Sequence, residues 1–240
     1  MKSNFSIKMM MQTLWTDFYG WSVKEYAWLV LASLAIIVTS LVMGGGMIEL
    51  ISSLTGIVGA ILVAKGKISS YAWGVVATAL YAWVSYGYQL YGETILYTLV
   101  FLPMQFIGYY YWIKSSSQVG DAIVDVIKRA LSTRQRLFTV GATIAAIVGY
   151  AAFLRVLEGA MPGMDAATAI LSVTATLLMV RRFAEQWIAW IVVNVVAVTM
   201  WVVMVLQHQD QGWAVLAMWI VFLLNSIYGW VQWRTAKVEG

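Results

Sequence analysis

Residues 181–207 read RRFAEQWIAWIVVNVVAVTMWVVMVLQ, an arginine pair followed by a long apolar run that carries no charge after Glu185. A helix of about 20 apolar residues is long enough to cross the roughly 30 Å hydrocarbon core of a bilayer. Lipid offers no hydrogen bonds, so the backbone of such a run must satisfy its own polar groups, and a helix does this. Residues 186–207 are therefore predicted to form a transmembrane helix.

Seven further runs share this character. Apolar residues make up 62% of the 240-residue chain and charged residues only 11%, which is far from the composition of a soluble domain. The eight predicted spans are roughly 24–43, 47–65, 70–91, 93–113, 136–155, 164–180, 186–207 and 213–233. The chain has no cysteine, which excludes disulfides and cysteine-based metal sites. The expected fold class is an all-α polytopic membrane protein with eight transmembrane helices.

The basic residues are distributed unevenly between the loops. If the eight spans alternate in direction, fourteen of the fifteen Lys and Arg residues fall on one side of the membrane and only Arg155 on the other. Cytoplasmic loops carry an excess of Lys and Arg. Both termini are therefore predicted to be cytoplasmic, in a multi-pass protein of the inner (plasma) membrane. These loops also account for the net charge of +4, so no nucleic acid partner is expected.

Two segments outside the spans show helical spacing of apolar residues and are predicted to lie as helices on the inner leaflet. The first stripe consists of Met11, Leu14, Trp15, Phe18 and Trp21. The second lies in the long cytoplasmic loop and consists of Val119, Ile123, Ile127 and Leu131. Packing of either segment against the helix bundle is an equally good interpretation.

The last three spans resemble spans two to four. Span four closes with Gly108 and Trp112, and span eight closes with Gly229 and Trp233 at the same spacing. Repeats in the same orientation are a known transporter plan, with the substrate near the midplane between them. The predicted core is therefore 3+1+3, plus one extra N-terminal helix. The five predicted parts are 1–46 (interfacial helix and extra span), 47–113 (first repeat), 114–160 (cytoplasmic loop and linker span), 161–234 (second repeat) and 235–240 (cytoplasmic tail).

Three uncharged amides are predicted to lie near the middle of the membrane. Gln105, Asn194 and Asn225 each lie nine residues from a charged residue at the end of their span. Nine helical residues rise about 13.5 Å, close to half of the bilayer core. An amide that faces lipid without a partner costs several kcal/mol, so these side chains are expected to line a shared substrate site. Hydrogen bonding between neighbouring helices is the alternative.

Aromatic side chains accompany these amides. Trp190 precedes Asn194 by one turn. Tyr109 follows Gln105 by one turn, and Trp73 lies in the span that pairs with that of Trp190. The three aromatic residues are the expected walls of the site. Their ring faces would attract a cationic ligand without any carboxylate.

The middle of every span lacks Asp, Glu, Lys, Arg and His. Coupling to protons or sodium usually relies on such a group within the membrane, so passive movement of a substrate is expected. The single histidine, His208, lies in an outer loop, and motifs of hydrolases, zinc proteases and phosphate-binding loops are absent. We therefore do not expect the chain to be an enzyme or to bind a metal or cofactor. Pro103 is expected to bend span four beside Gln105 and to permit gating there.

Three segments carry a further pattern. They contain Pro103, Gln105, Gly108 and Trp112 in the first, Glu185, Trp187, Trp190 and Asn194 in the second, and Tyr71, Gly74, Leu80 and Tyr81 in the third. This pattern resembles the PnuC family of vitamin transporters. The resemblance covers roughly residues 47–234 and implies a 3+1+3 plan similar to that of the SWEET proteins. It also implies uptake of nicotinamide riboside by facilitated diffusion, with metabolic trapping inside by kinases, and a homo-oligomer, most simply a trimer. Family members often carry Asn where this chain has Ala77, so the site is expected to be asymmetric.

Two alternatives remain open at this point. Relatives that carry thiamine, riboflavin or a related nucleoside share the architecture, and the sequence separates these substrates poorly. A membrane scaffold that transports nothing would use the same amides only to join helices.

Overall fold

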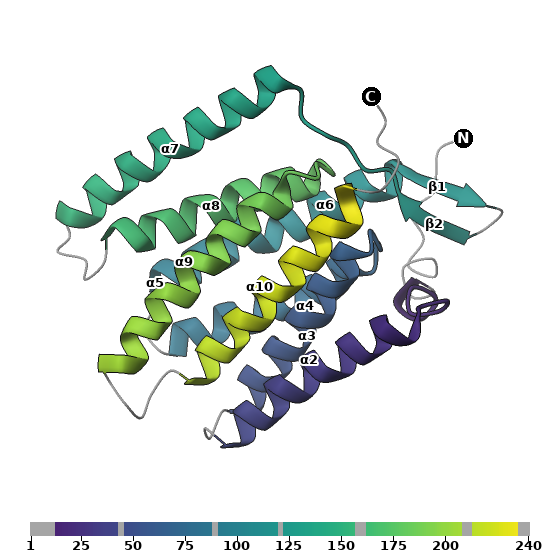
Figure 1. Cartoon of the computed structure of the whole chain (residues 1–240), viewed down its shortest axis with the longest axis horizontal. Coiled ribbons are helices and arrows are strands. Elements are labelled where there is room, and N and C mark those ends of the chain that lie inside the picture. Colours follow the sequence, from purple (N-terminus) through teal and green to yellow (C-terminus); the bar gives the residue numbers. More distant parts are fainter. Residues whose placement is uncertain are drawn as a thin grey trace. The chain divides into compact units, whose positions relative to one another are not determined.

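The computed structural model describes residues 13–42, 46–87, 91–119, 122–156, 162–207 and 213–234 (Figure 1). The chain divides into an N-terminal unit, Met1–Ile127 with Val180–Arg182, and a C-terminal unit, Lys128–Met179 with Phe183–Gly240. Met11, His208, most of the predicted outer loops and the tail 235–240 lie outside the described residues.

The helices of the N-terminal unit are α2 (Val23–Val42), α3 (Met47–Ala64), α4 (Ser70–Gly87), α5 (Tyr91–Leu96) and α6 (Leu102–Lys114), with a π-helical turn η1 (Tyr97–Phe101) between the last two. Helix α3 packs against α2 on one side and α4 on another, and α4 also packs against α6. An added Cβ at Gly59 of α3 would lie 3.4 Å from the carbonyl oxygen of Ser70. Small residues thus allow α3 and α4 to approach closely, as is common in membrane helices.

The predicted fourth span is broken into three helical pieces. Proline has no backbone N–H, and in a regular α-helix its ring collides with the carbonyl four residues earlier. The backbone of Leu102 donates to the carbonyl of Tyr97, five residues back, so the chain widens into η1 directly before Pro103. The ring of Tyr97 lies 4.2 Å from that of Tyr81 on α4 and 4.9 Å from that of Phe101. These ring contacts pack the irregular turn against its neighbour.

The long loop after α6 forms a β-hairpin, so the prediction of an amphipathic helix over 119–131 is wrong. Strand β1 (Ser116–Val119) pairs antiparallel with β2 (Ala122–Val126). The segment AIVDVI at 122–127 alternates apolar and polar residues only in part and is rich in Val and Ile, whose branched side chains favour strands. Leu131 beyond the hairpin is buried, as the alternative of packing against the bundle requires.

The predicted N-terminal interfacial helix ends at residue 16, before Phe18 and Trp21 of its predicted stripe, and the residues that follow pack on the α3–α4 turn. Helical backbone at 13–16 is followed by a turn at 17–20. The carboxylate of Asp17 accepts a hydrogen bond from the backbone N–H of Ser69 at 3.0 Å. The indole N–H of Trp21 donates to the carbonyl of Asp17, and the ammonium of Lys65 lies 4.7 Å from the centre of the Trp21 ring.

The C-terminal unit contains α7 (Thr133–Val156), α8 (Pro162–Val180), α9 (Gln186–Gln207) and α10 (Trp213–Arg234). Helices α9 and α10 pack against each other, and the hydroxyls of Thr143 on α7 and Thr174 on α8 lie 3.2 Å apart. The segment before α7 joins the α8–α9 turn, because Glu185 accepts hydrogen bonds from the backbone N–H of Leu131 and from Arg136.

The α3–α4 and α8–α9 turns have the same backbone geometry at positions 116 residues apart. The left-handed position is Gly66 (φ +72°) in the first turn and Arg182 (φ +67°) in the second. The next residue donates to the carbonyl five residues earlier at 2.9 Å in both turns, which is the hydrogen bond of a Schellman helix end. This register pairs Asn194 with Thr78, whereas an alignment of Trp73 with Trp190 pairs Asn194 with Ala77.

Near the start of α4 and of α9, an aromatic ring packs on a glycine of a neighbouring helix. Tyr71 of α4 packs on Gly108 of α6 and meets the edge of Trp112 at 5.0 Å. In the other unit, Trp187 of α9 packs on Gly229 of α10. The Trp187 ring meets that of Trp233 at 6.1 Å, again at a steep angle. The Gly-x3-Trp pattern of the sequence is thus a seat for an aromatic ring in both units.

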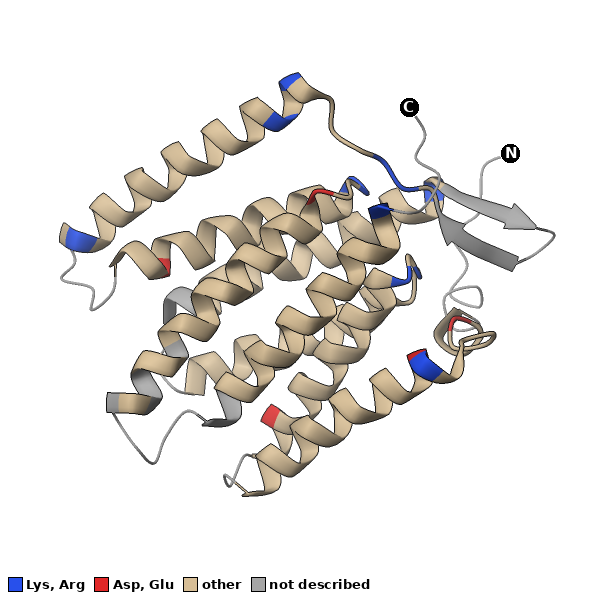
Figure 2. Cartoon of the chain, in the orientation of Figure 1, with Lys and Arg blue, Asp and Glu red and all other residues tan. Residues whose placement is uncertain are grey.

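Five helices in the described part are long and apolar enough to cross a membrane: α2, α3, α7, α8 and Leu216–Arg234 of α10. Figure 2 shows Lys and Arg near the ends of helices, while the middles of the helices carry no charge. Large apolar side chains such as Phe138 and Val148 on α7 are exposed, which suits a surface covered by lipid. The chain is therefore a helical membrane protein.

Replacing Gly108 or Gly229 by alanine should lower the free energy of unfolding by about 1–3 kcal/mol, because the new methyl group would overlap the packed ring. An ideal Cβ would lie 2.5 Å from Cζ of Tyr71 at Gly108 and 2.6 Å from Cδ2 of Trp187 at Gly229. Gly141→Ala in α7 is the control, since nothing lies within 4 Å of its added Cβ. Thermal unfolding in detergent measures the difference, and equal stability of the three variants would contradict this packing.

Candidate functional site

A buried polar pair joins α9 to α10. The side-chain N–H of Asn194 donates to the hydroxyl of Ser226 at 2.8 Å, and this hydroxyl donates to the carbonyl of Phe222 at 2.8 Å. Asn194 is 3% exposed and Asn225, beside Ser226, is 1% exposed. The structure therefore brings two of the three predicted amides into the same part of the C-terminal unit. A residue that serves only to hold two helices together would also form the bond to Ser226. The bond uses the Asn194 side-chain N–H, so the side-chain carbonyl oxygen can still accept from a further donor.

Trp190 lies one turn before Asn194 on the same face of α9. Its side chain is partly exposed, whereas Asn194 is buried. A ring in this position can offer its face to a flat ligand while the amide offers hydrogen bonds one turn away.

In the N-terminal unit, the amide of Gln105 on α6 lies directly over Gly74 on α4. An added Cβ at Gly74 would lie only 2.8 Å from Cδ of Gln105, so the glycine makes room for the amide. Tyr109, one turn later on α6, is buried, and Pro103 is exposed two residues before Gln105. The predicted polar residue of α6 therefore lies in the contact between α4 and α6.

Trp73 contacts the N-terminal segment and lies close to α3. The edge of its ring meets Phe18 of the N-terminal segment at 6.3 Å and 90°. The Cβ of Trp73 also lies near Gly59 of α3, while the neighbouring residue Gly74 is the one that contacts Gln105. The structure therefore brings Trp73 together with Phe18, a residue that the sequence did not connect with it.

Buried polar atoms without a hydrogen-bond partner gather at the starts of α4 and α9. In the described residues there are eight such side-chain atoms, and seven of them belong to Ser69, Ser70, Tyr71, Trp73, Gln186 and Trp187. In the register of the two turns, Ser70 corresponds to Gln186 and Tyr71 to Trp187. Apart from Trp73, the sequence analysis did not single out these residues as parts of a site, because polar groups near helix ends usually face the membrane surface. Their position within one turn of a basic turn was the available signal.

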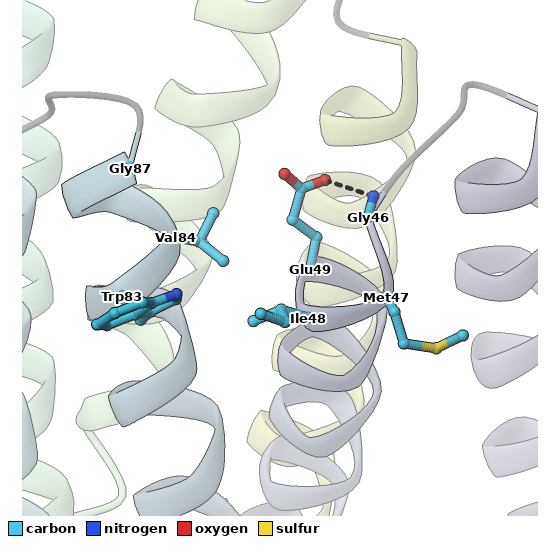
Figure 3. Close-up of a pocket in the computed structure, with 7 residues that line it drawn as sticks. All are labelled: Gly46, Met47, Ile48, Glu49, Trp83, Val84 and Gly87. Carbon is cyan, nitrogen blue, oxygen red and sulfur yellow. Dashed lines mark hydrogen bonds between the residues drawn. The ribbon is translucent and has the colours of Figure 1, made fainter.

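The described part of the chain also has an open pocket of about 520 Å³ between the first turn of α3 and the last turns of α4 (Figure 3). Its lining includes Trp83 and Glu49, and the Glu49 carboxylate accepts a hydrogen bond from the backbone N–H of Gly46. None of the predicted site residues lines this pocket. Within the described ranges, no three His, Asp or Glu side chains come together as a metal site would require.

Removing the hydrogen bond between Asn194 and Ser226 should cost stability. Asn194→Ala and Ser226→Ala are expected to show a coupling energy of about 0.6–2 kcal/mol in a double-mutant cycle of unfolding, as interhelical polar pairs do. Thr199→Ala is the control, because that exposed hydroxyl bonds only the carbonyl of Val195 in its own helix. Additive effects of Asn194→Ala and Ser226→Ala would show that the pair does not hold the two helices together.

Comparison with known proteins identifies the family. The family profile described as "Nicotinamide mononucleotide transporter" matches residues 46–235. The chain is 35% identical over 217 residues to the nicotinamide riboside transporter PnuC of Neisseria mucosa, which covers 90% of this chain and 82% of that one. It is 34% identical over 216 residues to the nicotinamide riboside transporter PnuC of Haemophilus influenzae, which covers 89% of this chain and 91% of the relative.

A solved structure gives the same result. The crystal structure of the vitamin B3 transporter PnuC matches with a TM-score of 0.80 at 33% sequence identity, and the match covers 96% of this chain and 97% of that one. The similarity therefore extends over the helices that carry the polar residues described above. The chain belongs to the PnuC family of membrane transporters.

Proposed function

We propose that this protein carries nicotinamide riboside across the bacterial inner membrane by facilitated diffusion, with conversion inside the cell trapping the product. The main support is the similarity over 90% of the chain to a relative that is named for this substrate. The physical support is the absence of charge in the middle of the helices in the described part of the chain, together with buried amides and aromatic rings. A carrier without an intramembrane ionisable group has no evident means of coupling to protons.

The proposed substrate-binding residues are Gln105, Trp190, Asn194, Asn225, Trp73 and Tyr109. Nicotinamide riboside combines a flat, positively charged pyridinium ring with a carboxamide and ribose hydroxyls. The face of Trp190 suits the ring, since aromatic faces attract cations. Amides can both donate to and accept from the carboxamide and the hydroxyls. The position of Trp73 against Phe18 makes it the least direct of these contacts.

The proposed topology is eight spans in a 3+1+3 arrangement with one extra N-terminal helix and both termini in the cytoplasm. The five long apolar helices supply five spans. Helices α4 and α9 and the composite α5–η1–α6 supply the other three. The basic residues Lys65, Lys114 and Arg234 lie at the ends of α3, α6 and α10, and the positive-inside tendency assigns these helix ends to the cytoplasm. A homotrimer and bending at Pro103, where η1 already interrupts the regular helix, complete the proposal.

Two other functions compete with this one. The buried bond between Asn194 and Ser226 favours a role of these residues in joining helices, as a scaffold would use them. Transport of thiamine, riboflavin or a related nucleoside would use the same kinds of side chain.

Uptake into vesicles that contain the purified protein separates these functions. Labelled nicotinamide riboside should enter without any ion gradient until its concentrations inside and outside are equal. Unlabelled nicotinamide riboside should compete more strongly than thiamine or riboflavin. Accumulation above equality would contradict facilitated diffusion, stronger competition by another vitamin would reassign the substrate, and no uptake of any of them would favour the scaffold.

Gln105→Leu and Asn194→Leu should each weaken binding of nicotinamide riboside about tenfold, the loss expected for one or two hydrogen bonds. Thr199→Val on α9 is the control, because this side chain is exposed and should not alter affinity. Calorimetric titration of the purified variants measures the dissociation constants. Unchanged affinity in folded Leu variants would assign both amides to helix packing alone.

A further inference from the structure

Gln186 at the start of α9 is completely buried, at 0% exposure. Neither its Nε2 nor its Oε1 has a hydrogen-bond partner among the described residues. A buried amide without partners is unfavourable, and such groups in proteins nearly always acquire a partner. The molecule therefore carries a donor and an acceptor that this conformation leaves unused.

The place of Gln186 in the helix relates it to the proposed site. Gln186, Trp190 and Asn194 follow one another at intervals of four residues, so the three lie along one face of α9. Trp190 is the middle member, with an amide one turn to either side. The indole N–H of Trp187, next to Gln186, is also buried without a partner.

The neighbouring charge does not compete for this role. The carboxylate of Glu185 accepts hydrogen bonds from the backbone N–H of Leu131 at 3.1 Å and from Arg136 at 2.9 Å. Glu185 is therefore fixed by the segment before α7. At this end of the α9 face, the group still able to bond a ligand is the neutral amide of Gln186.

The best hydrogen-bonding partner of a primary amide such as that of Gln186 is another primary amide. Its N–H can donate to a carbonyl oxygen while its own oxygen accepts from an NH₂ group, so two primary amides can form two parallel hydrogen bonds. A carboxylate offers only acceptors and would face the amide oxygen unfavourably. A site built for such pairing rejects analogues that lack the matching group.

We propose that Gln186 is a substrate-binding residue that recognises the carboxamide on the pyridinium ring with two hydrogen bonds. This inference rests on the proposed function. The ring lies on the face of Trp190, and the ribose hydroxyls point toward Asn194. Because the amide is covered in the present conformation, it meets the substrate when this end of α9 becomes accessible during the transport cycle.

The test combines changes in the residue with changes in the ligand. The variant is Gln186→Leu, and the control is Gln232→Leu on α10, where the side chain is exposed. The ligands are nicotinamide riboside, pyridinium riboside without the carboxamide, and nicotinic acid riboside. Calorimetric titration of the full-length protein in detergent gives the dissociation constants, and vesicle uptake gives KM and the maximal rate.

Gln186→Leu should weaken binding of nicotinamide riboside at least about tenfold and change binding of pyridinium riboside by less than about twofold. The wild type should prefer nicotinamide riboside over nicotinic acid riboside, and this preference should be lost in the variant. Gln232→Leu should change none of these values. Gln186→Met, which keeps the length of the side chain without the amide, replaces the Leu variant if the latter does not fold.

If Gln186→Leu weakened binding of both ribosides equally, or of neither, the role of Gln186 would be overturned. Its amide would then be explained by hydrogen bonds to water. Failure of the wild type to bind or carry nicotinamide riboside would instead overturn the proposed function. The two failures are thus distinguished by the wild-type measurement alone.

Discussion

The whole structure depends on one constraint: a polar group inside a membrane must find its partner within the protein. This constraint makes the apolar runs helical and places the reversals of the chain at helix ends. It explains why η1 precedes Pro103, where a regular helix would lose a hydrogen bond and suffer a collision. It also explains the bond from Asn194 to Ser226, which satisfies an amide in the interior of the C-terminal unit. The groups at the starts of α4 and α9 that lack a partner depart from this rule, and each such group calls for an explanation, of which a functional role is one.

Aromatic rings seated on glycines provide the packing between helices. Tyr71 rests on Gly108 in one unit and Trp187 rests on Gly229 in the other. Each ring follows a turn with the same left-handed position and the same hydrogen bond across five residues. The repetition of ring, glycine and turn in two parts of the chain is what the predicted duplication would produce. These packed contacts lie one or two helical turns from the polar residues of both units.

The sequence was sufficient for the features that follow from composition and helical spacing. Long uncharged runs predict helices, and the Gly-x3-Trp pattern marks a real packing device at Gly108 and Gly229. The hairpin at 116–126 was missed because a short apolar stripe fits a helix and a strand almost equally well. The break at η1 was foreseen only as a bend at Pro103, since sequence does not show how the backbone relieves a proline.

Single side chains were harder to place than helices. Trp73 was predicted as a wall of the site, and nothing in the sequence indicated its contacts with Phe18 and with α3 at Gly59. The residue that corresponds to Asn194 depends on what is aligned, because the two turns give Thr78 and the two tryptophans give Ala77. Gln186 went unnoticed since burial of a residue at a helix end cannot be read from spacing.

A structure of the protein with nicotinamide riboside bound would test the central claim most directly, namely that the buried amides exist to contact substrate. The account predicts the pyridinium ring against the face of Trp190, with Asn194 and Gln105 within hydrogen-bond distance of the ligand. A ligand bound elsewhere, with Asn194 still bonded to Ser226 and Gln105 out of contact with the ligand, would contradict it.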